Sequence, residues 1–402
     1  MMKRADKYRG HLLGIGSGAG RRVLILSAGM GAGHDAVAVE LAGRLAAAGH
    51  TADVADVLGL LPLGLGRALR GWYGWMMRRA PWSYALIYRV FFVPGRARAA
   101  SGGRGPASLA SPLTVLAAAR VHRLLRRHPP DLVVSTFHLA AQAAGHLRRT
   151  GRSRVPSVVL LTDFAAHRLW LHPGTDRYLC PCPETARDVA AVSGRPALCH
   201  APLTRPAFRE ARAGAAAVRA RLGTRPGGRL VLVSAGSWGV GEVEETARVL
   251  ARSGRYVPVV LCGRNEALRA RLGATEGAVA LGWRTDLPEL MSAAHALVDN
   301  AAGLTCREAF AARLPVVSYR PIPGHGRDGV LAMARAGLGV HAGDAGRLLT
   351  ELDRLADPVV RARLVARAAA LFDAPPAEDL LFGPHAVRVS DPDGSRSPDR
   401  AG

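Results

Sequence analysis

The sequence contains few cysteines, almost no lysine and no long apolar run. The five cysteines, at positions 180, 182, 199, 262 and 306, are odd in number and mostly isolated, which argues against a disulfide framework and fits a reducing compartment. Cys180 and Cys182 form a C-x-C without a second pair at zinc-finger spacing, so buried strand cysteines are favoured over a metal site. No charge-free stretch reaches the roughly 18 apolar residues of a membrane span, and HLLGIGSGAG is short for a signal peptide. These absences predict a cytoplasmic protein.

Acidic residues are also scarce. The chain has 54 Lys and Arg against 31 Asp and Glu, a net charge of +23, and its only lysines are Lys3 and Lys7. An excess of this size favours an anionic partner, which can be nucleic acid, a nucleotide or a membrane surface. Coding bias can also enrich arginine. The excess is concentrated between Asp56 and Asp131, where there is no acidic residue but there are twelve arginines and eight aromatic residues.

The 402 residues, 49% of them hydrophobic, can bury a large core and favour two domains. From residue 22 a buried strand, a glycine turn and a helix alternate, as expected for a parallel sheet covered on both faces. RLVLVSAGSWG restarts the pattern at residue 229. We therefore predict an α/β fold of two Rossmann-like domains. The predicted segments are a flexible N-terminus (1–21), a first domain (22–203), a linker (204–228), a second domain (229–375) and a disordered tail (376–402), with a mobile loop over 93–112.

The first motif is GMGAGH, Gly29 to His34, between a strand and a helix. Glycines let a ligand approach the backbone, and the helix N-terminus behind them favours negative charge. The motif is neither a complete G-x-G-x-x-G nor a Walker loop. His34 follows the first strand, where open α/β sheets bind ligands, and a neutral imidazole there can accept a proton. A helix-capping or core histidine is an equally good interpretation of this position alone.

The second motif is TDFAAHRLWLHPGTDRYLCPCPE, residues 162–184. Asp163 ends a strand, and His167 and Trp170 follow at a spacing that can share one face of a helical turn. A cleft carboxylate and a carboxylate that only caps the turn are both consistent with this pattern.

The third motif lies in the second domain. SAGSWG (234–239), ALGW (280–283) and DNAAGLTCREAFAARLPVVSYRPIPGHG (299–326) contain glycine or small-residue loops that open helices. Two such loops can form one anion site, and Glu308 can accept hydrogen bonds from sugar hydroxyls, which together suits a nucleotide. Taken singly, each loop is also compatible with an ordinary strand–helix turn.

These blocks, with HAPLTRPAF and VVLCGRNEAL in the same order, resemble the monogalactosyldiacylglycerol synthase and processive diacylglycerol glucosyltransferase family over roughly residues 22–340. The glycine loops alone also fit the related peptidoglycan UDP-N-acetylglucosamine transferase. The resemblance implies a GT-B fold, a UDP-hexose bound mainly by the second domain, and a lipid acceptor, such as diacylglycerol, bound by the first. It also implies inverting hexosyl transfer.

Carried over by position, the resemblance makes His34 the candidate base, with Asp163 and His167 beside it and Gly31 and Gly33 on the acceptor side. It implies nucleotide-sugar contacts from a larger set: Gly236, Ser237, Arg264, Gly282, Trp283, Gly303, Thr305, Glu308 and His325. Two loops depart from the family pattern. DNAAG (299–303) stands where relatives have K-P-G-G, and PGHGRDG (323–329) stands where they have P-G-Q-E followed by Asn. Neither domain contains a D-x-D pair, so we expect a metal-free reaction without a cofactor.

The acid-free stretch has the composition of an interfacial membrane segment. It mixes Trp72, Trp75 and Trp82 with arginines such as Arg78 and Arg79, and Pro81 divides it into two short helices. Aromatic residues enter the headgroup region, while arginines meet anionic lipid. We therefore expect peripheral attachment to the inner face of the cell membrane. For this segment, the alternative is an amphipathic helix packed on the sheet. For the whole protein, one alternative function is a UDP-N-acetylglucosamine 2-epimerase, which needs no lipid-facing segment. The other is a nucleic-acid-binding protein, for which no recognised module is visible.

Overall fold

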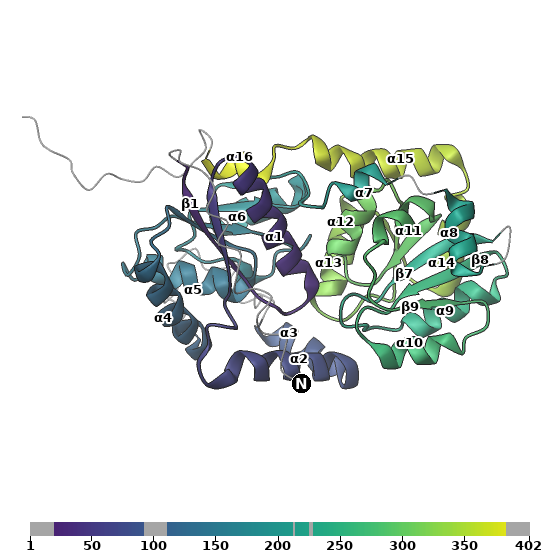
Figure 1. Cartoon of the computed structure of the whole chain (residues 1–402), viewed down its shortest axis with the longest axis horizontal. Coiled ribbons are helices and arrows are strands. Elements are labelled where there is room, and N and C mark those ends of the chain that lie inside the picture. Colours follow the sequence, from purple (N-terminus) through teal and green to yellow (C-terminus); the bar gives the residue numbers. More distant parts are fainter. Residues whose placement is uncertain (1–19, 92–110, 212–213, 225–227, 383–402) are drawn as a thin grey trace, which may run out of the picture.

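The computed structural model describes residues 20–91, 111–211, 214–224 and 228–382, and Figure 1 shows two α/β domains side by side. Each is built on a parallel six-stranded sheet, so the expected fold class is confirmed. The predictions for residues 1–19, for most of the 93–112 loop and for residues beyond 382 lie outside the described residues.

The first sheet has the order β2-β1-β3-β4-β5-β6. Its strands are almost fully buried at β1, β3, β4 and β5 because helices cover both faces, which explains their continuous apolar runs. The strands are β1 (Arg22–Ser27), β2 (Thr51–Asp56), β3 (Leu132–Ser135), β4 (Ser157–Leu160), β5 (Arg177–Cys180) and β6 (Ala197–Cys199). The main covering helices are α1 (Ala32–Ala47), α4 (Pro112–Arg127), α5 (His138–Arg149) and α6 (Pro183–Ser193).

The second sheet repeats this design in the order β12-β11-β10-β7-β8-β9. Its strands are β7 (Arg229–Ser234), β8 (Tyr256–Leu261), β9 (Val279–Leu281), β10 (Ala296–Asp299), β11 (Val316–Tyr319) and β12 (Val340–Ala342). Its helices include α9 (Val243–Arg252), α10 (Glu266–Gly273), α11 (Leu287–Ala293), α12 (Leu304–Ala311), α13 (His325–Arg335) and α14 (Ala345–Arg354). Two apolar clusters, one on each face of this sheet, form the domain core.

The segment predicted as a linker contains two short helices, α7 (Ala207–Glu210) and α8 (Ala215–Leu222), which both contact α11. Beyond them, α15 (Pro358–Ala369) runs along the second domain and η5 (Ala370–Asp373) leads the chain back (Figure 1). The predicted disordered tail is wrong for its first residues, because α16 (Ala377–Phe382) packs on α1 and buries Ala377 and Leu381 in the first domain's core.

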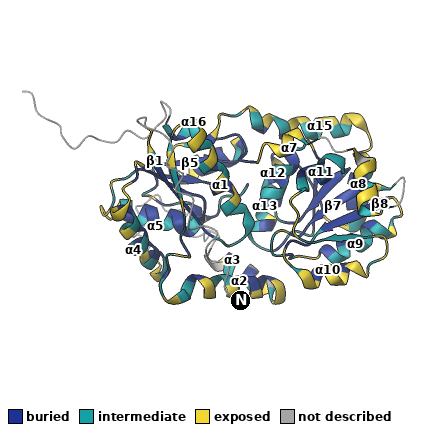
Figure 2. Ribbon diagram, viewed as in Figure 1, coloured by how far each residue is buried: buried dark blue, intermediate teal, exposed yellow. Residues whose placement is uncertain are grey.

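The acid-free stretch contains α4 and, before it, α2 (Leu65–Arg79) and α3 (Pro81–Phe91), with a break between these two helices at Pro81 as predicted. Proline fits the first turn of a helix because no intrahelical partner awaits its missing N–H. Figure 1 places this α2–α3 hairpin below the gap between the two domains, and Figure 2 shows that exposed and buried residues alternate along it. No helix among the described residues is both long enough and apolar enough to cross a bilayer.

Candidate active site

The strand order brings three polar residues, two of them predicted, to one edge of the first sheet. β1, β3 and β4 are neighbours in the first sheet, so the residues that follow their carboxyl ends lie close together. His34 lies in the first turn of α1 after β1, His138 begins α5 after β3, and Asp163 follows β4. The sequence analysis did not select His138, although its position after a buried strand is the signal that selected His34.

His34 has a defined ring orientation. Its Nδ1 lies 2.9 Å from the carbonyl oxygen of Thr136 and 2.9 Å from Oγ1 of Thr162. A carbonyl oxygen can only accept, so Nδ1 carries the proton and donates it to Thr136. This leaves Nε2 unprotonated, with a lone pair that is available to a ligand. Burial lowers the pKa of His34, although Asp163 opposes that shift, so the imidazole is neutral at pH 7.

The second motif assembles as predicted around Trp170, which is fully buried. Its Nε1 donates to Oδ2 of Asp163 at 2.9 Å, so the carboxylate is held by the indole rather than used as a helix cap. The ring centroids of His167, His138 and His34 lie 5.9, 6.2 and 6.3 Å from that of Trp170. Asp163 and the imidazoles therefore form one histidine cluster in the cleft.

The pKa shifts in the histidine cluster favour an ionised carboxylate surrounded by neutral imidazole rings. Burial pushes the pKa of Asp163 up, but His34, His325 and His167 together outweigh burial and lower it. Burial lowers the pKa of His167 to about 4 and that of His138 well below its ordinary value. At neutral pH the cluster consequently holds an ionised Asp163 and uncharged histidines.

The predicted nucleotide loops meet at the carboxyl edge of the second sheet, after β7 to β11. Gly236 and Ser237 follow β7, and the loop after β8 packs against them backbone to backbone. A Cβ on Gly263 would overlap the carbonyl of Gly236, and the N–H of Arg264 donates to Ser237 O at 3.2 Å. Gly263 has a φ of 61°, which only glycine adopts at little cost.

Trp283 follows Gly282 after β9 and is 51% exposed. The guanidinium of Arg264 lies 4.5 Å from the centroid of its ring, a distance typical of a cation–π contact. An aromatic face and a cation therefore lie together at the outer edge of the nucleotide loops.

The DNAAG segment (299–303), which departs from the family pattern, has a structural role in this protein. Asp299 is buried, and its Oδ2 accepts from the N–H groups of Ala301 (2.8 Å) and Ala302 (2.6 Å). It thereby shapes the loop that leads to Gly303, the N-cap of α12, and to Thr305 in the first turn. The N-cap is a glycine, so no capping side chain accepts a hydrogen bond from the first N–H groups of α12.

Two neighbouring residues on α12 differ in their surroundings. Burial raises the pKa of Glu308 to about 7, although Arg205 and Arg307 oppose the shift. Arg307 is 2% exposed, and its Nη2 donates across the cleft to the carbonyl of Thr162, beside Asp163. Among the described residues its Nε and Nη1 have no hydrogen-bond partner. No sequence signal distinguished this arginine.

The PGHGRDG departure places His325 at the start of α13. Its Nδ1 lies 2.6 Å from the hydroxyl of Tyr84, and three residues later Asp328 accepts from Tyr88 at 2.9 Å. Both tyrosines belong to α3, so the PGHGRDG segment of the second domain contacts the α2–α3 hairpin of the first.

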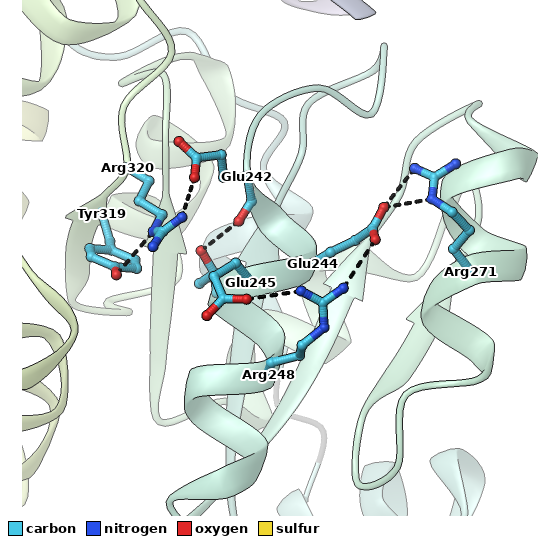
Figure 3. Close-up of polar contacts among 8 residues, drawn as sticks. Glu242, Glu244, Glu245, Arg248, Arg271, Tyr319 and Arg320 are labelled. Carbon is cyan, nitrogen blue, oxygen red and sulfur yellow. Dashed lines mark hydrogen bonds and ion pairs between the residues drawn. The ribbon is translucent and has the colours of Figure 1, made fainter.

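A surface network ties this loop to the one after β7. Figure 3 shows the carboxylate of Glu242, just before α9, directed at Arg320, which also donates from Nε to Tyr319 at 3.0 Å. Arg248 contacts Glu244 and Glu245 on the same helix. Exposed pairs of this kind contribute about 0–1 kcal/mol each, so they align the loops more than they stabilise the domain.

The cleft is closed at its centre. The N–H of Ala32, at the start of α1, donates to Ser237 Oγ at 3.1 Å. A Cβ on Gly31 would lie 3.6 Å from Trp238 Nε1, and one on Gly33 would lie 3.6 Å from Leu304 Cβ. The glycines predicted for the acceptor side therefore contact the nucleotide loops, and the N-termini of α1 and α12 face the same space.

A cavity of about 310 Å³ is lined by residues of both domains. It lies between the segment after Asp163 and α13, and that volume is at the lower end for small-molecule sites. Its polar lining residues are Arg168, Asp188, Asp328 and Arg335, and its apolar lining includes Phe164 and Leu331.

The predicted membrane residues lie on the exposed side of the α2–α3 hairpin, although the guanidinium of Arg78 is also 5.8 Å from the ring centroid of Trp238 in the loop after β7. Trp72, Trp75 and Trp82 are 50%, 55% and 72% exposed, and Arg78 and Arg79 are also exposed. Tyr84 and Tyr88 of the same hairpin do not share this surface, because they are buried. The exposure that an interfacial segment needs is therefore found for these three tryptophans and not for Tyr84 and Tyr88.

Comparison with known proteins confirms the resemblance expected from the sequence. Residues 34–196 match the family model of monogalactosyldiacylglycerol (MGDG) synthase. A processive diacylglycerol beta-glucosyltransferase of Bacillus subtilis is 28% identical over 218 residues, which cover 52% of this chain and 56% of the relative. The chain thus spans about half the length of the curated relatives it matches.

Solved structures confirm the GT-B fold. The glycosyltransferase SnogD from Streptomyces nogalater superposes with a TM-score of 0.55 at 20% identity, covering 90% of this chain and 97% of that one. HepE of Anabaena in complex with UDP-glucose gives a TM-score of 0.51 at 13% identity over 88% and 94% of the two chains.

Proposed function

We propose that this chain is an inverting hexosyltransferase that moves a sugar from a UDP-hexose to a hydroxyl of diacylglycerol or a related membrane lipid. The observation that carries the proposal is His34, whose Nδ1–H is held by Thr136 and whose Nε2 is free in the cleft beside Asp163. The name of the Bacillus subtilis relative supports the lipid acceptor, and the UDP-glucose in the HepE structure supports the donor.

His34 serves as the general base. The acceptor hydroxyl gives its proton to Nε2 while its oxygen forms a bond to the anomeric carbon, and the bond from that carbon to UDP breaks on the opposite face, which inverts the configuration. Proton transfer makes His34 an imidazolium, and the ionised Asp163 nearby stabilises that charge. Trp170 keeps the carboxylate in place through its indole N–H.

The leaving diphosphate needs positive potential, which this chain can supply without a metal. The N-termini of α1 and α12 face the same space, and a helix N-terminus attracts phosphate through its free N–H groups and its dipole. Ser237 adds a hydroxyl there. Glu308, when ionised, accepts hydrogen bonds from the ribose, while Trp283 and Arg264 border the uracil.

The lipid-facing surface is assigned to the exposed side of the α2–α3 hairpin. Trp72, Trp75 and Trp82 project from it, and α2, α3 and α4 contain arginines but no acidic residue. Tryptophans of this kind enter the headgroup region, and each arginine near an anionic surface contributes about 1 kcal/mol. The protein would then attach peripherally to the inner face of the membrane and reach a lipid acceptor there.

The test is transfer of label. Purified full chain is incubated with diacylglycerol vesicles and radiolabelled UDP-glucose, UDP-galactose or UDP-N-acetylglucosamine, and the lipids are separated by thin-layer chromatography. We expect a labelled lipid from at least one UDP-hexose and none from the His34→Ala variant. Conversion of UDP-N-acetylglucosamine to its 2-epimer with no labelled lipid would contradict the proposal and identify an epimerase.

A further inference from the structure

The α2–α3 hairpin has a second face, opposite the tryptophans. Met76, Tyr84 and Tyr88 are 2%, 5% and 4% exposed, although they alternate along the chain with Trp75 and Trp82, which are more than half exposed. The two helices are therefore amphipathic in the sense that one side is buried and the other is open to solvent.

The buried face packs on the donor domain. Met76, Met77, Tyr84 and Tyr88 form one apolar cluster with Ile322 of the second domain, and Val240 and Ala301 pack against it. These three donor-domain residues belong to the loops that follow β11, β7 and β10. On the same side, Trp238 lies directly against Gly74, where a Cβ would overlap the indole. The hairpin thus touches each central loop of the proposed nucleotide-sugar site.

Two hydrogen bonds orient the loop that holds His325. The Tyr84 hydroxyl lies 2.6 Å from His325 Nδ1, and the Tyr88 hydroxyl donates to Asp328 at 2.9 Å. Gly324 lies between the two rings, since a Cβ there would come within 2.8 Å of Tyr88 and 3.0 Å of Tyr84. Burial raises the pKa of the Tyr84 hydroxyl well above its ordinary value and lowers that of His325, so the phenol keeps its proton and the imidazole is neutral. Because the Tyr84 hydroxyl occupies Nδ1, Nε2 is the ring nitrogen of His325 that can contact a ligand.

The other end of the hairpin is anchored in the acceptor domain. Gly66 lies against the backbone of Leu58, and Arg70 forms an ion pair with Asp56. Leu65 and Leu69 pack on the core of the first domain. The hairpin therefore spans the cleft from an anchor in one domain to the loops of the other.

We infer that Tyr84 and Tyr88 are positioning residues for the donor sugar, and that they couple the binding of a lipid surface on one face of the hairpin to the binding of a UDP-hexose on its other face. This inference rests on the proposed function. A bilayer that holds the tryptophan face fixes the hairpin, which fixes the two tyrosines and, through them, His325 and Asp328. Coupling between two sites is reciprocal, so the donor sugar must strengthen lipid binding by the same factor.

The first experiment separates the sugar from the nucleotide. UDP and UDP-glucose are titrated calorimetrically into the full chain, as wild type, Tyr84→Phe and Tyr88→Phe, without lipid. Losing one positioning hydrogen bond should weaken the binding of UDP-glucose by about three- to tenfold and the binding of UDP by less than about twofold. Tyr256→Phe is the matched control, because Tyr256 gives its hydrogen bond to Asp353 far from the cleft and its loss should change neither affinity.

The second experiment measures the coupling. Phosphatidylglycerol–phosphatidylcholine vesicles without diacylglycerol are added, so no acceptor is present. Wild type should bind UDP-glucose more tightly with vesicles, and vesicles more tightly with UDP-glucose, by equal factors. The double variant Tyr84→Phe/Tyr88→Phe should float with vesicles as wild type does but show no mutual enhancement. Normal flotation together with a loss of mutual enhancement would not follow from a general loss of folding.

Different results would overturn the proposed function and the coupling through Tyr84 and Tyr88. If wild type binds neither UDP nor UDP-glucose, the proposed function is overturned and this inference with it. If wild type binds both but the tyrosine variants bind UDP-glucose unchanged, or vesicles do not alter the affinity for UDP-glucose, the inference alone is overturned.

Discussion

At the scale of single residues, His34 is the group on which the chemistry depends. We expect His34→Ala to lower kcat by about 10²- to 10⁴-fold, because the base is lost, and to leave the Kd of UDP within about twofold. Single-turnover kinetics and calorimetry measure the two quantities. His34→Gln is the control, because an amide N–H can keep the bond to Thr136 but cannot take a proton. A His34→Gln variant that retains more than a tenth of the activity would exclude the base role.

Glu308 should make UDP binding depend on pH. Its pKa is raised to about 7 by burial, and the ionised carboxylate is the better acceptor for ribose hydroxyls. UDP affinity should therefore rise as the pH increases from 6 to 8, with close to a tenfold change per unit below the pKa. Glu308→Gln should bind about 1.5–3 kcal/mol more weakly at pH 8 and show a flat profile. A wild-type profile that is equally flat would exclude Glu308 from the ribose site.

The same pKa has the opposite consequence for the empty protein. A folded-state pKa raised from 4.5 to about 7 means that the unfolded chain loses this proton first as pH rises. The contribution of Glu308 to stability therefore falls between pH 4.5 and 7 and is constant above that range. Chemical denaturation at pH 5 and pH 8 should show a smaller loss of stability for Glu308→Gln than for wild type.

At the scale of elements, the α2–α3 hairpin is expected to bind anionic vesicles. Wild type should float with phosphatidylglycerol vesicles and be released as salt is raised, because the attraction of arginines is screened within about 8–10 Å at physiological ionic strength. The triple variant Trp72→Ala/Trp75→Ala/Trp82→Ala should lose flotation. Trp283→Ala is the matched control, since that tryptophan is similarly exposed but lies on the donor domain. Flotation of the triple variant at wild-type level would reject this surface.

Helix α16 is an element on which the first domain depends. Leu381 is 4% exposed in the core of that domain, and Arg177 donates to the neighbouring carbonyl of Leu380. Leu381→Ala should lower the free energy of unfolding by about 2–5 kcal/mol, through lost burial and the cavity left behind. Asp379→Ala on the exposed side of the same helix should change it by less than about 0.5 kcal/mol. Equal stability of the two variants in urea unfolding would show that α16 does not belong to the folded unit.

At the scale of the whole molecule, Arg307 links the two domains in their closed arrangement. Its Nη2 bonds to Thr162 across the cleft, but its Nε and Nη1 have no partner among the described residues, so the buried cation is costly. A methionine of similar length removes the two unpaired donors and their desolvation cost. We expect Arg307→Met to keep or raise Tm while the radius of gyration, measured by small-angle scattering, increases. A fall in Tm without a change in radius would mean that Arg307 stabilises the fold rather than closure.

Much of the fold and half of the candidate site could be predicted from the sequence. Buried parallel strands are recognisable because helices on both faces demand continuous apolar runs, and the helix break at Pro81 follows from the missing N–H. His34 and Asp163 could be found because polar side chains that follow such strands meet at one sheet edge. The prediction of a disordered tail was wrong at 377–382 because the surrounding composition is polar and rich in proline. Ala377 and Leu381 are ordered through their packing in the core of the first domain, which is distant in sequence.

The sequence by itself determined the two sheets, the order of the glycine loops and the residues at their edges, because backbone hydrogen bonding and burial periodicity are local. Only the tertiary structure decided which residues that lie far apart in the sequence meet in the candidate site. His34 with Thr136, Arg307 with Thr162 and Tyr84 with His325 are separated by 102, 145 and 241 positions. Such contacts depend on how two domains and a hairpin pack in space, and no local pattern in either partner encodes the other. For the same reason composition could place tryptophans and tyrosines in one helix pair, but only packing assigned the tryptophans to the surface and the tyrosines to the donor loops.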